Sequence, residues 1–299
     1  MFKKTRSIPL ELIILRILNY RTDLSDKEKL QLPNKEKGDE EEVKFDSLIQ
    51  NLDTLVINDL LLEVGDTLFQ IDTLIIFYAR IYLIDVKNFE GEYCYESGIF
   101  KTKSGSEKKD PMLQLNRCHS ELRQLFQKYG HNLPIDAFLV FINPEFTLFQ
   151  PTPNPQINLS SQVSSFIKKL HKMTSNLTDK HLKLADLLVS LHITKNPYVK
   201  LPKFDYDTLK KGMTCGSCHS FDVSVGRTKL TCGKCGCEEC VESAVLRNLD
   251  ELRVLFPGIK ITTRLVHEWC KDISSTKMIR RILKSNFKAI GNTKESYYE

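Results

Sequence analysis

The sequence predicts a mixed α/β domain in the N-terminal half of the chain, then a helical connecting region, then a small cysteine-rich ribbon followed by helices. Three observations predict this fold class: strand-like apolar runs lie between amphipathic segments up to residue 150, cysteines come in close pairs between residues 215 and 240, and apolar residues recur at helical spacing after residue 241. At 299 residues the chain can bury more than one hydrophobic core, so we expect several domains. We place them at residues 1–150, 151–205, 206–240 and 241–299.

The composition excludes several classes of protein. Hydrophobic residues make up 41% of the chain, so broad disorder is excluded. The apolar stretch at residues 10–18 is interrupted by Glu11 and Arg16 and is too short to cross a bilayer, and no cleavage site of a secretory signal follows it. We therefore expect a cytoplasmic protein without a membrane partner. The formal net charge of +5 does not by itself indicate a nucleic-acid partner.

The elements of the N-terminal domain follow from the spacing of apolar residues. A helix over residues 9–20 and a polar stretch to residue 35 are expected as an appendage to this domain. The order that follows is helix, three strands, helix and strand, expected at residues 40–52, 55–61, 68–78, 80–87, 110–129 and 137–142. Asp110 and Pro111 suit the N-cap and the first turn of the second of these helices.

The connecting region begins with a proline-rich segment, Gln150-Pro151-Thr152-Pro153-Asn154-Pro155. Three prolines exclude a helix or a central strand there, because proline lacks an amide donor and restricts the residue before it. We interpret the segment as a linker or a long surface loop. Two helices are expected beyond it, over residues 160–174 and 178–191, and no function follows from their sequence.

Acidic side chains interrupt two otherwise apolar strands of the N-terminal domain. Asp72 lies in the strand at 68–78, and Asp85 and Lys87 lie in the next strand, where the alternation of side chains places both on one face. If the two strands form a hairpin that turns symmetrically about residues 78 and 79, residues whose numbers sum to 157 face each other. Asp72 then lies opposite Asp85, with Cβ atoms about 4.5–5.5 Å apart.

Two carboxylates this close repel each other unless a cation holds them. Hard oxygen ligands without a required histidine favour Mg²⁺ or Mn²⁺, and the backbone carbonyl of Val86 could add a further ligand. Lys87 beside the metal would orient or help to deprotonate an attacking water, while the metal stabilises a pentacovalent phosphate. The pattern therefore predicts hydrolysis of phosphodiester bonds.

The same residues could instead form ordinary ion pairs on a solvated face of the sheet, and an isolated match of this kind often arises by chance. The strands around them are strongly apolar, which indicates that the charges are enclosed. Enclosed charges usually have a partner or a catalytic function, so the context favours a site.

Four motifs follow one another in the N-terminal half. They are Gly38-Asp39-Glu40-Glu41-Glu42 leading into Phe45-Asp46, Gln70-Ile71-Asp72-Thr73-Leu74, Asp85-Val86-Lys87-Asn88-Phe89-Glu90-Gly91, and Asp110-Pro111-Met112-Leu113-Gln114. In this order they resemble the nuclease-related (NERD) domain family. The resemblance covers about residues 1–150 and implies a fold like that of PD-(D/E)xK nucleases, a restriction-endonuclease-like α/β fold.

The resemblance also implies roles for site residues. Asp72, Asp85 and Lys87 take the metal-site roles argued above, a glutamate of the first helix supplies a further acid, and Gln114 lies near the site. The family usually has Glu where this chain has Asp85, a shorter acid that still fits the pattern. Gln114 could instead be a simple amide on the helix surface.

The identity of the helical acid stays open, because Glu41 replaces the glycine that usually precedes it in the family. We prefer Glu42, since Phe45 and Ile49 follow it at helical spacing and put it on the buried face. Glu41 has nearly as good a case through Phe45 and Leu48.

Six of the nine cysteines lie between residues 215 and 240, which in a reducing compartment indicates metal binding. Cys215-Gly-Ser-Cys218 and Cys232-Gly-Lys-Cys235 are two CxxC pairs separated by thirteen residues, a spacing typical of a Cys₄ zinc ribbon. Two strands, at 221–225 and 227–231, fit between them. Such a zinc site is closed, so it would stabilise the module rather than do chemistry.

Cys237 and Cys240 form a third pair, which could displace Cys235 or bind a second ion, and we interpret both as spare. A redox function of the CxxC pairs lacks a surrounding βαβ pattern. We interpret His219 as a surface residue.

Three helices are expected after the ribbon, over residues 241–256, from about residue 263, and after the turn at Ser274-Ser275. The third has an apolar face and an opposite cationic face, made of Lys277, Arg280, Arg281, Lys284 and Lys288. A charged stripe is more commonly a solvated helix face. Here the single sign of the charge, the adjoining ribbon and the helix-turn-helix arrangement favour DNA binding.

Two functions of different classes are compatible with these patterns. The first is a Mg²⁺- or Mn²⁺-dependent nuclease that its zinc ribbon and C-terminal helices bring to DNA. The second is a DNA-binding or regulatory protein whose nuclease-like domain does not cut. The presence of Asp72, Asp85 and Lys87 together favours the first.

Overall fold

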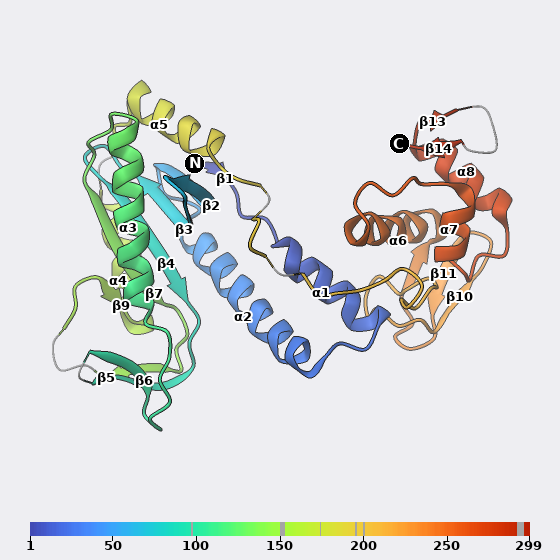
Figure 1. Cartoon of the computed structure of the whole chain (residues 1–299), viewed down its shortest axis with the longest axis horizontal. Helices are drawn as coiled ribbons and strands as arrows, with labels where there is room; N and C mark the ends of the chain where they lie inside the picture. The colour runs from blue at the N-terminus through green and yellow to red at the C-terminus, as the bar shows by residue number, and fades with distance from the viewer. Residues whose placement is uncertain (97, 150–152, 174, 195, 200, 292–295) are drawn as a thin grey trace. The chain divides into compact units, whose positions relative to one another are not determined.

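A computed structural model describes residues 1–299 except residues 97, 150–152, 174, 195, 200 and 292–295 (Figure 1). The chain forms two compact units. The first combines Met1–Ile8 with Asn34–Val199, and the second combines Pro9–Pro33 with Lys200–Glu299. Each unit therefore draws on two separate stretches of the chain.

A six-stranded sheet forms the centre of the first unit, with its strands in the order β1-β2-β3-β4-β7-β9. They span Phe2–Lys4 (β1), Leu55–Val64 (β2), Thr67–Ile76 (β3), Ile81–Lys87 (β4), Ile135–Phe141 (β7) and Ile157–Asn158 (β9). Strands β2, β3 and β4 pair antiparallel, whereas β1 is parallel to β2, and β7 is parallel to both β4 and β9. The sheet is therefore mixed, and the hairpin of β3 and β4 lies at its middle.

Helices cover both faces of this sheet. They are Pro111–Lys128 (α3), Ser160–His171 (α4), Asp179–Ser190 (α5) and the part of α2 (Asp26–Ile49) from Asn34 onward, since the residues of α2 up to Pro33 belong to the second unit. Leu122 of α3 and Leu184 of α5 pack in one apolar cluster with the sheet, whereas Phe45 of α2 and Phe166 of α4 pack in another. Alternate side chains of a strand point to opposite faces, so the two clusters are the two sides of one sheet. The unit has three layers, α/β/α.

Three short strands of the first unit form a separate sheet in the order β6-β5-β8. They span Gly91–Glu96 (β5), Ile99–Thr102 (β6) and Phe146–Phe149 (β8). Within this sheet Tyr93 stacks on Phe100 with ring centres 5.2 Å apart. Phe146 of β8 stacks on Phe141 of β7 at 4.0 Å, which joins the small sheet to the central one. Strand β5 of this sheet begins at Gly91, shortly after Lys87 ends β4.

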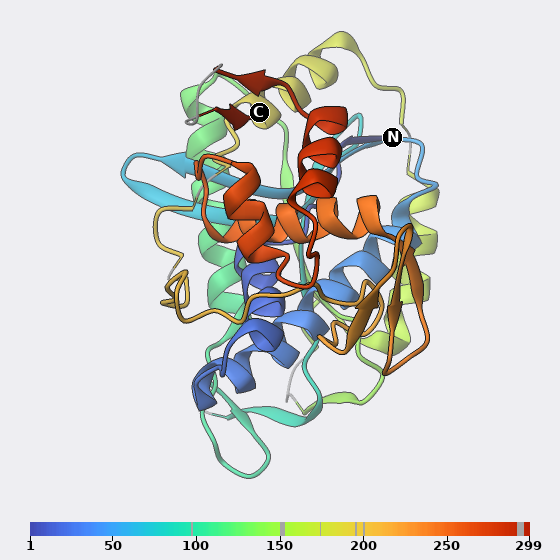
Figure 2. The same cartoon turned by 90° about the vertical axis from the view of Figure 1, so that its right-hand side faces the viewer.

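The second unit contains a three-stranded antiparallel sheet and three helices after it (Figure 2). The strands are Val223–Val225 (β10), Lys229–Cys232 (β11) and Glu238–Cys240 (β12), and the helices are Val241–Leu255 (α6), Thr263–Trp269 (α7) and Thr276–Asn286 (α8). Two short strands, Ala289–Ile290 (β13) and Tyr297–Tyr298 (β14), then pair antiparallel. Strand β12 is an addition to the two ribbon strands that the sequence predicts.

Helix α1 (Leu10–Arg21) belongs to the second unit, although its position in the sequence suggests an appendage to the first domain. Leu15 and Leu18 are buried in the same cluster as Leu249 and Trp269. Arg21 is 1% exposed and pairs with Glu251 at 2.6 Å. The apolar spacing predicts the helix but not its partners, because they lie more than 200 positions later.

Two further differences concern the polar segments. Helix α2 begins at Asp26, so much of the stretch expected to be irregular is helical. The first three residues of the predicted linker, 150–152, lie outside the described residues. No described helix combines the length and the apolar character that crossing a membrane requires.

Candidate functional site

The hairpin of β3 and β4 has the register that the sequence predicts. The two residue numbers of each pair sum to 157, from Thr73 with Ile84 to Ile76 with Ile81. The ladder of paired residues ends one position before Asp72 and Asp85, at Thr73 with Ile84. The amide of Val86 donates a hydrogen bond of 3.1 Å to Oδ2 of Asp72, so this carboxylate does reach across to β4.

Lys87 pairs with Asp85 on the same strand. Its Nζ lies 2.8 Å from Oδ1 of Asp85, and the two side chains are only 17% and 9% exposed. The second oxygen of Asp85, Oδ2, is buried and has no hydrogen-bond partner within the described part of the chain. An unpartnered buried carboxylate oxygen is unfavourable, so a cation at this oxygen would stabilise the folded protein.

Arg6 connects α2 to this hairpin. Its side chain is 6% exposed, and its Nη1 and Nε donate hydrogen bonds to Glu42 at 2.5 Å and to Asp46 at 3.1 Å. The Nη2 atom donates to the carbonyl oxygen of Asp72 at 3.0 Å. Because a guanidinium presents its donors in a rigid fork, Arg6 fixes the two helix acids relative to β3.

The two candidate acids of α2 have different partners. Glu42 contacts Arg6 and lies close enough to Asp72 and Lys87 for their charges to shift its pKa. Glu41 instead pairs with Lys44, one turn further along the same helix, at 3.5 Å. The geometry therefore brings Glu42 to the hairpin acids.

Burial and crowding raise the pKa values of two of these acids. Burial raises the pKa of Asp85 well above its ordinary value, Asp72 raises it further, and Lys87 opposes the shift. Burial and Asp72 also raise the pKa of Glu42 to about 7, although Arg6 lowers it. Burial lowers the pKa of Lys87, but Asp85 and Asp72 outweigh burial, and the pKa ends above its ordinary value. Lys87 is therefore a charged donor, and the acids are short of positive charge.

Helix α3 carries Gln114 on its first turn and Cys118 one turn later. Gln114 lies half-buried, and none of the hydrogen bonds among the described residues uses its side chain. Cys118 donates to the carbonyl oxygen of Gln70 at 3.3 Å. Burial, together with Asp85 and Asp72, raises the pKa of the Cys118 thiol to about 11. Sequence reasoning misses Cys118 and Arg6, since neither lies in a recognisable motif.

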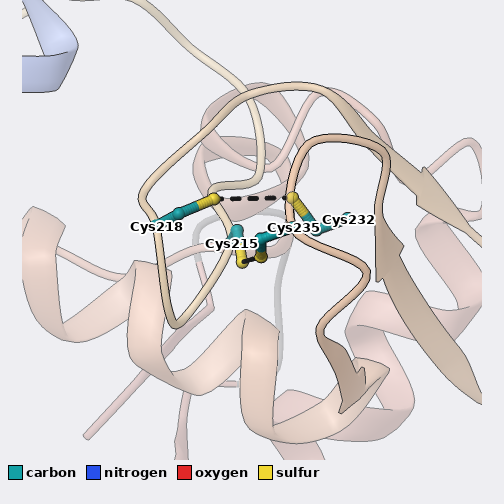
Figure 3. Close-up of side chains that lie close together, drawn as sticks. All are labelled: Cys215, Cys218, Cys232 and Cys235. Carbon is teal, nitrogen blue, oxygen red and sulfur yellow. Dashed lines mark hydrogen bonds between the residues drawn. The ribbon is translucent and has the colours of Figure 1, made fainter.

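Four cysteines converge in the second unit (Figure 3). The Sγ atoms of Cys215, Cys218, Cys232 and Cys235 all lie within 4.8 Å of one another, with Cys215–Cys235 and Cys218–Cys232 each at 3.6 Å. We call this set the cysteine cluster. Zn–S bonds of about 2.3 Å in a tetrahedron place sulfur atoms about 3.8 Å apart, so the cluster has the spacing for one Zn²⁺.

Backbone amides favour the thiolate form of Cys215. Although burial raises the pKa of Cys215, the amides of Cys218 and Ser217 lower it to about 6, and the thiolate is the form that binds zinc. Cys237 and Cys240 are free thiols that do not belong to the cluster. His219 is exposed and stacks on Tyr20 with ring centres 4.8 Å apart.

Four of the five predicted cations lie on the exposed side of α8, and Lys288 lies just beyond the helix, which ends at Asn286. Ile279, Ile282 and Leu283 of α8 are buried. The exposed residues include Lys277, Arg280, Arg281, Lys284 and Lys288. None of the ion pairs in the described part of the chain uses these five side chains, so the cationic stripe faces solvent.

Comparison with known families identifies the first unit. Residues 37–142 match the family model for NERD, the nuclease-related domain. These residues form a NERD domain. The domain contains Glu42, Asp72, Asp85 and Lys87, and it implies a nuclease-related function with nucleic acid as the suggested partner. No curated protein and no solved structure matched the chain.

The NERD domain covers about a third of the 299 residues. The cysteine cluster lies outside it, and so does Arg6, although Arg6 contacts the acids of the domain. The family match therefore includes neither the ribbon nor the arginine that contacts the acids.

Proposed function

We propose that the protein is a metal-dependent nuclease that hydrolyses phosphodiester bonds of DNA. One observation carries the proposal: Asp85 is buried against Lys87, and its Oδ2 has no hydrogen-bond partner among the described residues. Asp72 and Glu42, of the same NERD domain, are the further acids that we assign to this site. The four residues are Glu42, Asp72, Asp85 and Lys87. We call these four residues the acidic site. Enclosed carboxylates that outnumber their cations favour a bound divalent cation.

The chemistry of the donors favours Mg²⁺ or Mn²⁺ over softer metals. Asp72, Asp85 and Glu42 offer hard carboxylate oxygens, and the carbonyl of Val86 is a further proposed ligand. A cation held by these groups would supply positive charge to the scissile phosphate and to the attacking water.

The protein's own side chains would position the reactants. Lys87 keeps its proton because its pKa is raised, so it would donate a hydrogen bond that orients the water or a phosphate oxygen. Gln114 is proposed as a further polar group near the substrate. In the reaction the water oxygen would bond to phosphorus and the bond from phosphorus to the leaving oxygen would break. One proton of the water would pass to solvent, and the leaving oxygen would take up a proton from solvent.

The second unit would bring the NERD domain to its substrate. A structural Zn²⁺ in the cysteine cluster would hold the ribbon, which is too small to have a core of its own. The cations of α8 would contact phosphates in a helix-turn-helix arrangement.

Cleavage assays with the full-length protein test the proposal. With Mg²⁺ or Mn²⁺ the wild type is expected to cut labelled linear, circular or single-stranded DNA. Asp85→Asn and Lys87→Ala are expected to lower the rate at least ~100-fold, because each removes charge or orientation at the reacting phosphate. If wild type and Asp85→Asn cut equally, the cleavage is contamination and the proposal is wrong.

The matched control is Asp136→Asn. Asp136 lies on the neighbouring strand β7 and pairs with Arg80 at 2.7 Å near the surface, away from the acidic site. This variant should cut at the wild-type rate, which separates loss of the site from a general effect of replacing an acid in the sheet.

A second function has one observation in its favour. Lys87 and Arg6 already pair with Asp85 and Glu42, so these acids have cationic partners without a metal. A DNA-binding or regulatory protein with a non-cutting nuclease-like domain would have such a site. DNA binding by the wild type without cleavage in either metal would support this alternative.

A further inference from the structure

The elements after the ribbon have the order of a winged helix. After α6, Ile261 forms a β-bridge with Tyr298, whose amide donates to the Ile261 carbonyl at 2.8 Å. Helices α7 and α8 follow, and β13 then pairs with β14 (Figure 2). The order is therefore helix, bridge residue, helix, helix, strand, strand: β13 and β14 form a two-stranded antiparallel sheet, and Ile261 joins it through a single bridge. A helix-turn-helix closed in this way by a hairpin is a winged helix.

Helix α8 and the hairpin are anchored in one core. Ile279 and Leu283 of α8 are fully buried and share a hydrophobic cluster with Ile261, Tyr298 and Trp269. The amide and carbonyl of Lys288, directly after α8, exchange two backbone hydrogen bonds with Glu299 beside β14. The cationic side of α8 is therefore held outward in a fixed position relative to the hairpin.

Positive charge is concentrated in this part of the chain. Residues 257–299, which include both strands of the hairpin, contain nine Lys or Arg and four Asp or Glu, a net charge of +5, equal to that of the whole chain. Five of the nine form the stripe on and just after α8. The Nζ atom of Lys260 lies 5.4 Å from the ring centre of Tyr297, so a further cation lies beside the hairpin. Such a surface can contact phosphates at several neighbouring positions.

The shape of this surface favours duplex DNA over duplex RNA. Helix α8 has 11 residues. At a rise of about 1.5 Å per residue it is about 16 Å long, so it can lie along a groove and contact several phosphates. The major groove of B-form DNA is about 12 Å wide and admits an α-helix. The major groove of duplex RNA is too narrow for side chains to read.

The side chains also argue against a single strand as the partner. Proteins that bind single strands stack exposed aromatic rings on the bases. Here Phe287 is half-buried with Arg253 over its ring at 4.5 Å, Tyr297 is half-buried with Lys260 beside its ring at 5.4 Å, and Tyr298 is 6% exposed. The described part of this surface therefore offers cations rather than a stacking platform.

We propose that α8 binds duplex DNA in the major groove through its cationic side, with β13 and β14 as the support that holds the helix in place. This inference deepens the proposed function by specifying the nucleic acid. It rests on the DNA-binding part of that function and not on cleavage.

Binding assays on the full chain test this assignment. The parent protein carries Asp85→Asn so that the probe stays intact. Fluorescence anisotropy with a short duplex DNA, its single strand and a duplex RNA of the same sequence should show affinity for duplex DNA at least ~10-fold higher than for either alternative. Equal affinity for the three probes would overturn the proposal.

The variant that tests the surface is Arg280→Gln/Arg281→Gln, in which glutamine preserves helix propensity. Its affinity for duplex DNA should fall at least ~10-fold, and the slope of log affinity against log salt concentration should decrease by about 2, because two phosphate contacts are lost. Lys284→Gln alone should decrease the slope by about 1. Unchanged circular dichroism and zinc content show that the fold is kept.

The matched control is Lys168→Gln/Lys169→Gln, a pair of adjacent exposed lysines on α4 of the first unit. It should bind like the parent. If the arginine variant also binds like the parent while Asp85→Asn abolishes cleavage, this inference is wrong and the nuclease proposal stands. If instead the wild-type protein binds duplex DNA specifically but does not cut it, this inference stands and the nuclease proposal is wrong.

Discussion

Arg6 joins parts of the first unit that are far apart in the sequence. Its guanidinium donates to Glu42 and Asp46 of α2 and to the carbonyl oxygen of Asp72 on β3. The NERD match begins at residue 37, so this arginine belongs to a segment that the family model does not include. The acids of the domain are therefore held by a residue from outside it.

Replacing Arg6 by alanine is expected to destabilise the first unit by about 3 kcal/mol, because two largely enclosed carboxylates lose their cation. Urea unfolding followed by far-UV circular dichroism measures the change. Arg80→Ala is the matched control, since Arg80 forms an exposed pair with Asp136 and its loss should have no measurable effect. An Arg6→Ala variant as stable as the wild type would show that the guanidinium does not hold the helix acids.

The raised pKa of Glu42 predicts that binding of a divalent cation depends on pH. With a pKa of about 7, Glu42 carries a proton in the metal-free protein at lower pH, and a cation has to displace it. Affinity for Mn²⁺ should therefore rise up to about tenfold per pH unit below pH 7 and level off above it, as measured by titration calorimetry. Because this pKa is higher in the folded than in the unfolded chain, the metal-free protein should also lose stability as the pH rises toward 7.

Two variants separate the contributions of the helix acids to this pH dependence. Glu42→Gln should remove the rise just below pH 7, whereas Glu41→Gln should retain it, because Glu41 pairs with Lys44 instead. A pH profile that stays the same in Glu42→Gln would mean that another group titrates.

At the scale of elements, the β3–β4 hairpin shows what local sequence can predict. A short turn fixes the register, so the four pairs from Thr73 with Ile84 to Ile76 with Ile81 follow from counting residues. The contacts of Arg6 could not be predicted in this way. Its partners lie 36 to 67 positions later, and no local pattern encodes such a pairing.

The elements that the sequence does not predict share a physical reason. Strands β5, β6, β8, β13 and β14 have six residues or fewer, too few to show a period. The early part of α2 is rich in charge and has no apolar stripe. Tertiary contacts select the conformation of these segments, whereas periodicity reports only the burial of one face. The wing hairpin and the small aromatic sheet therefore become visible only in the structure.

At the scale of the whole molecule, each unit has its own core, and the single tryptophan of the chain lies in the second. The indole N–H of Trp269 donates to the carbonyl oxygen of Asn248 at 2.8 Å, and the guanidinium of Arg21 lies 4.2 Å from its ring centre. Tryptophan fluorescence therefore reports on the second unit alone.

Removal of zinc is expected to loosen this core. Arg247 of α6 donates to the carbonyl oxygen of Thr214, next to Cys215, at 2.6 Å, and to Glu239 of β12 at 2.7 Å, so the ribbon is tied to α6. Chelation should shift the emission of Trp269 to longer wavelength. It should also lower the midpoint of the fluorescence-detected thermal transition by on the order of 10 °C.

Serine variants assign the zinc ligands in the same assay. Cys232→Ser should reproduce the effect of chelation, whereas Cys240→Ser, outside the cysteine cluster, should keep one zinc per chain and the wild-type midpoint. Wild-type protein purified without zinc, yet with the same midpoint before and after chelation, would show that the ribbon needs no metal.

The membership of α1 in the second unit has a consequence for how the protein is made. Arg21 leaves the ribosome 230 positions before its partner Glu251. During that interval the apolar side of the nascent helix, with Leu12, Leu15 and Leu18, has none of its final neighbours from α6 and α7. The NERD domain can fold while translation continues, whereas the second unit can fold only after α6 and α7 have been synthesised. Chaperones that shield nascent apolar helices would have their main opportunity in this delay.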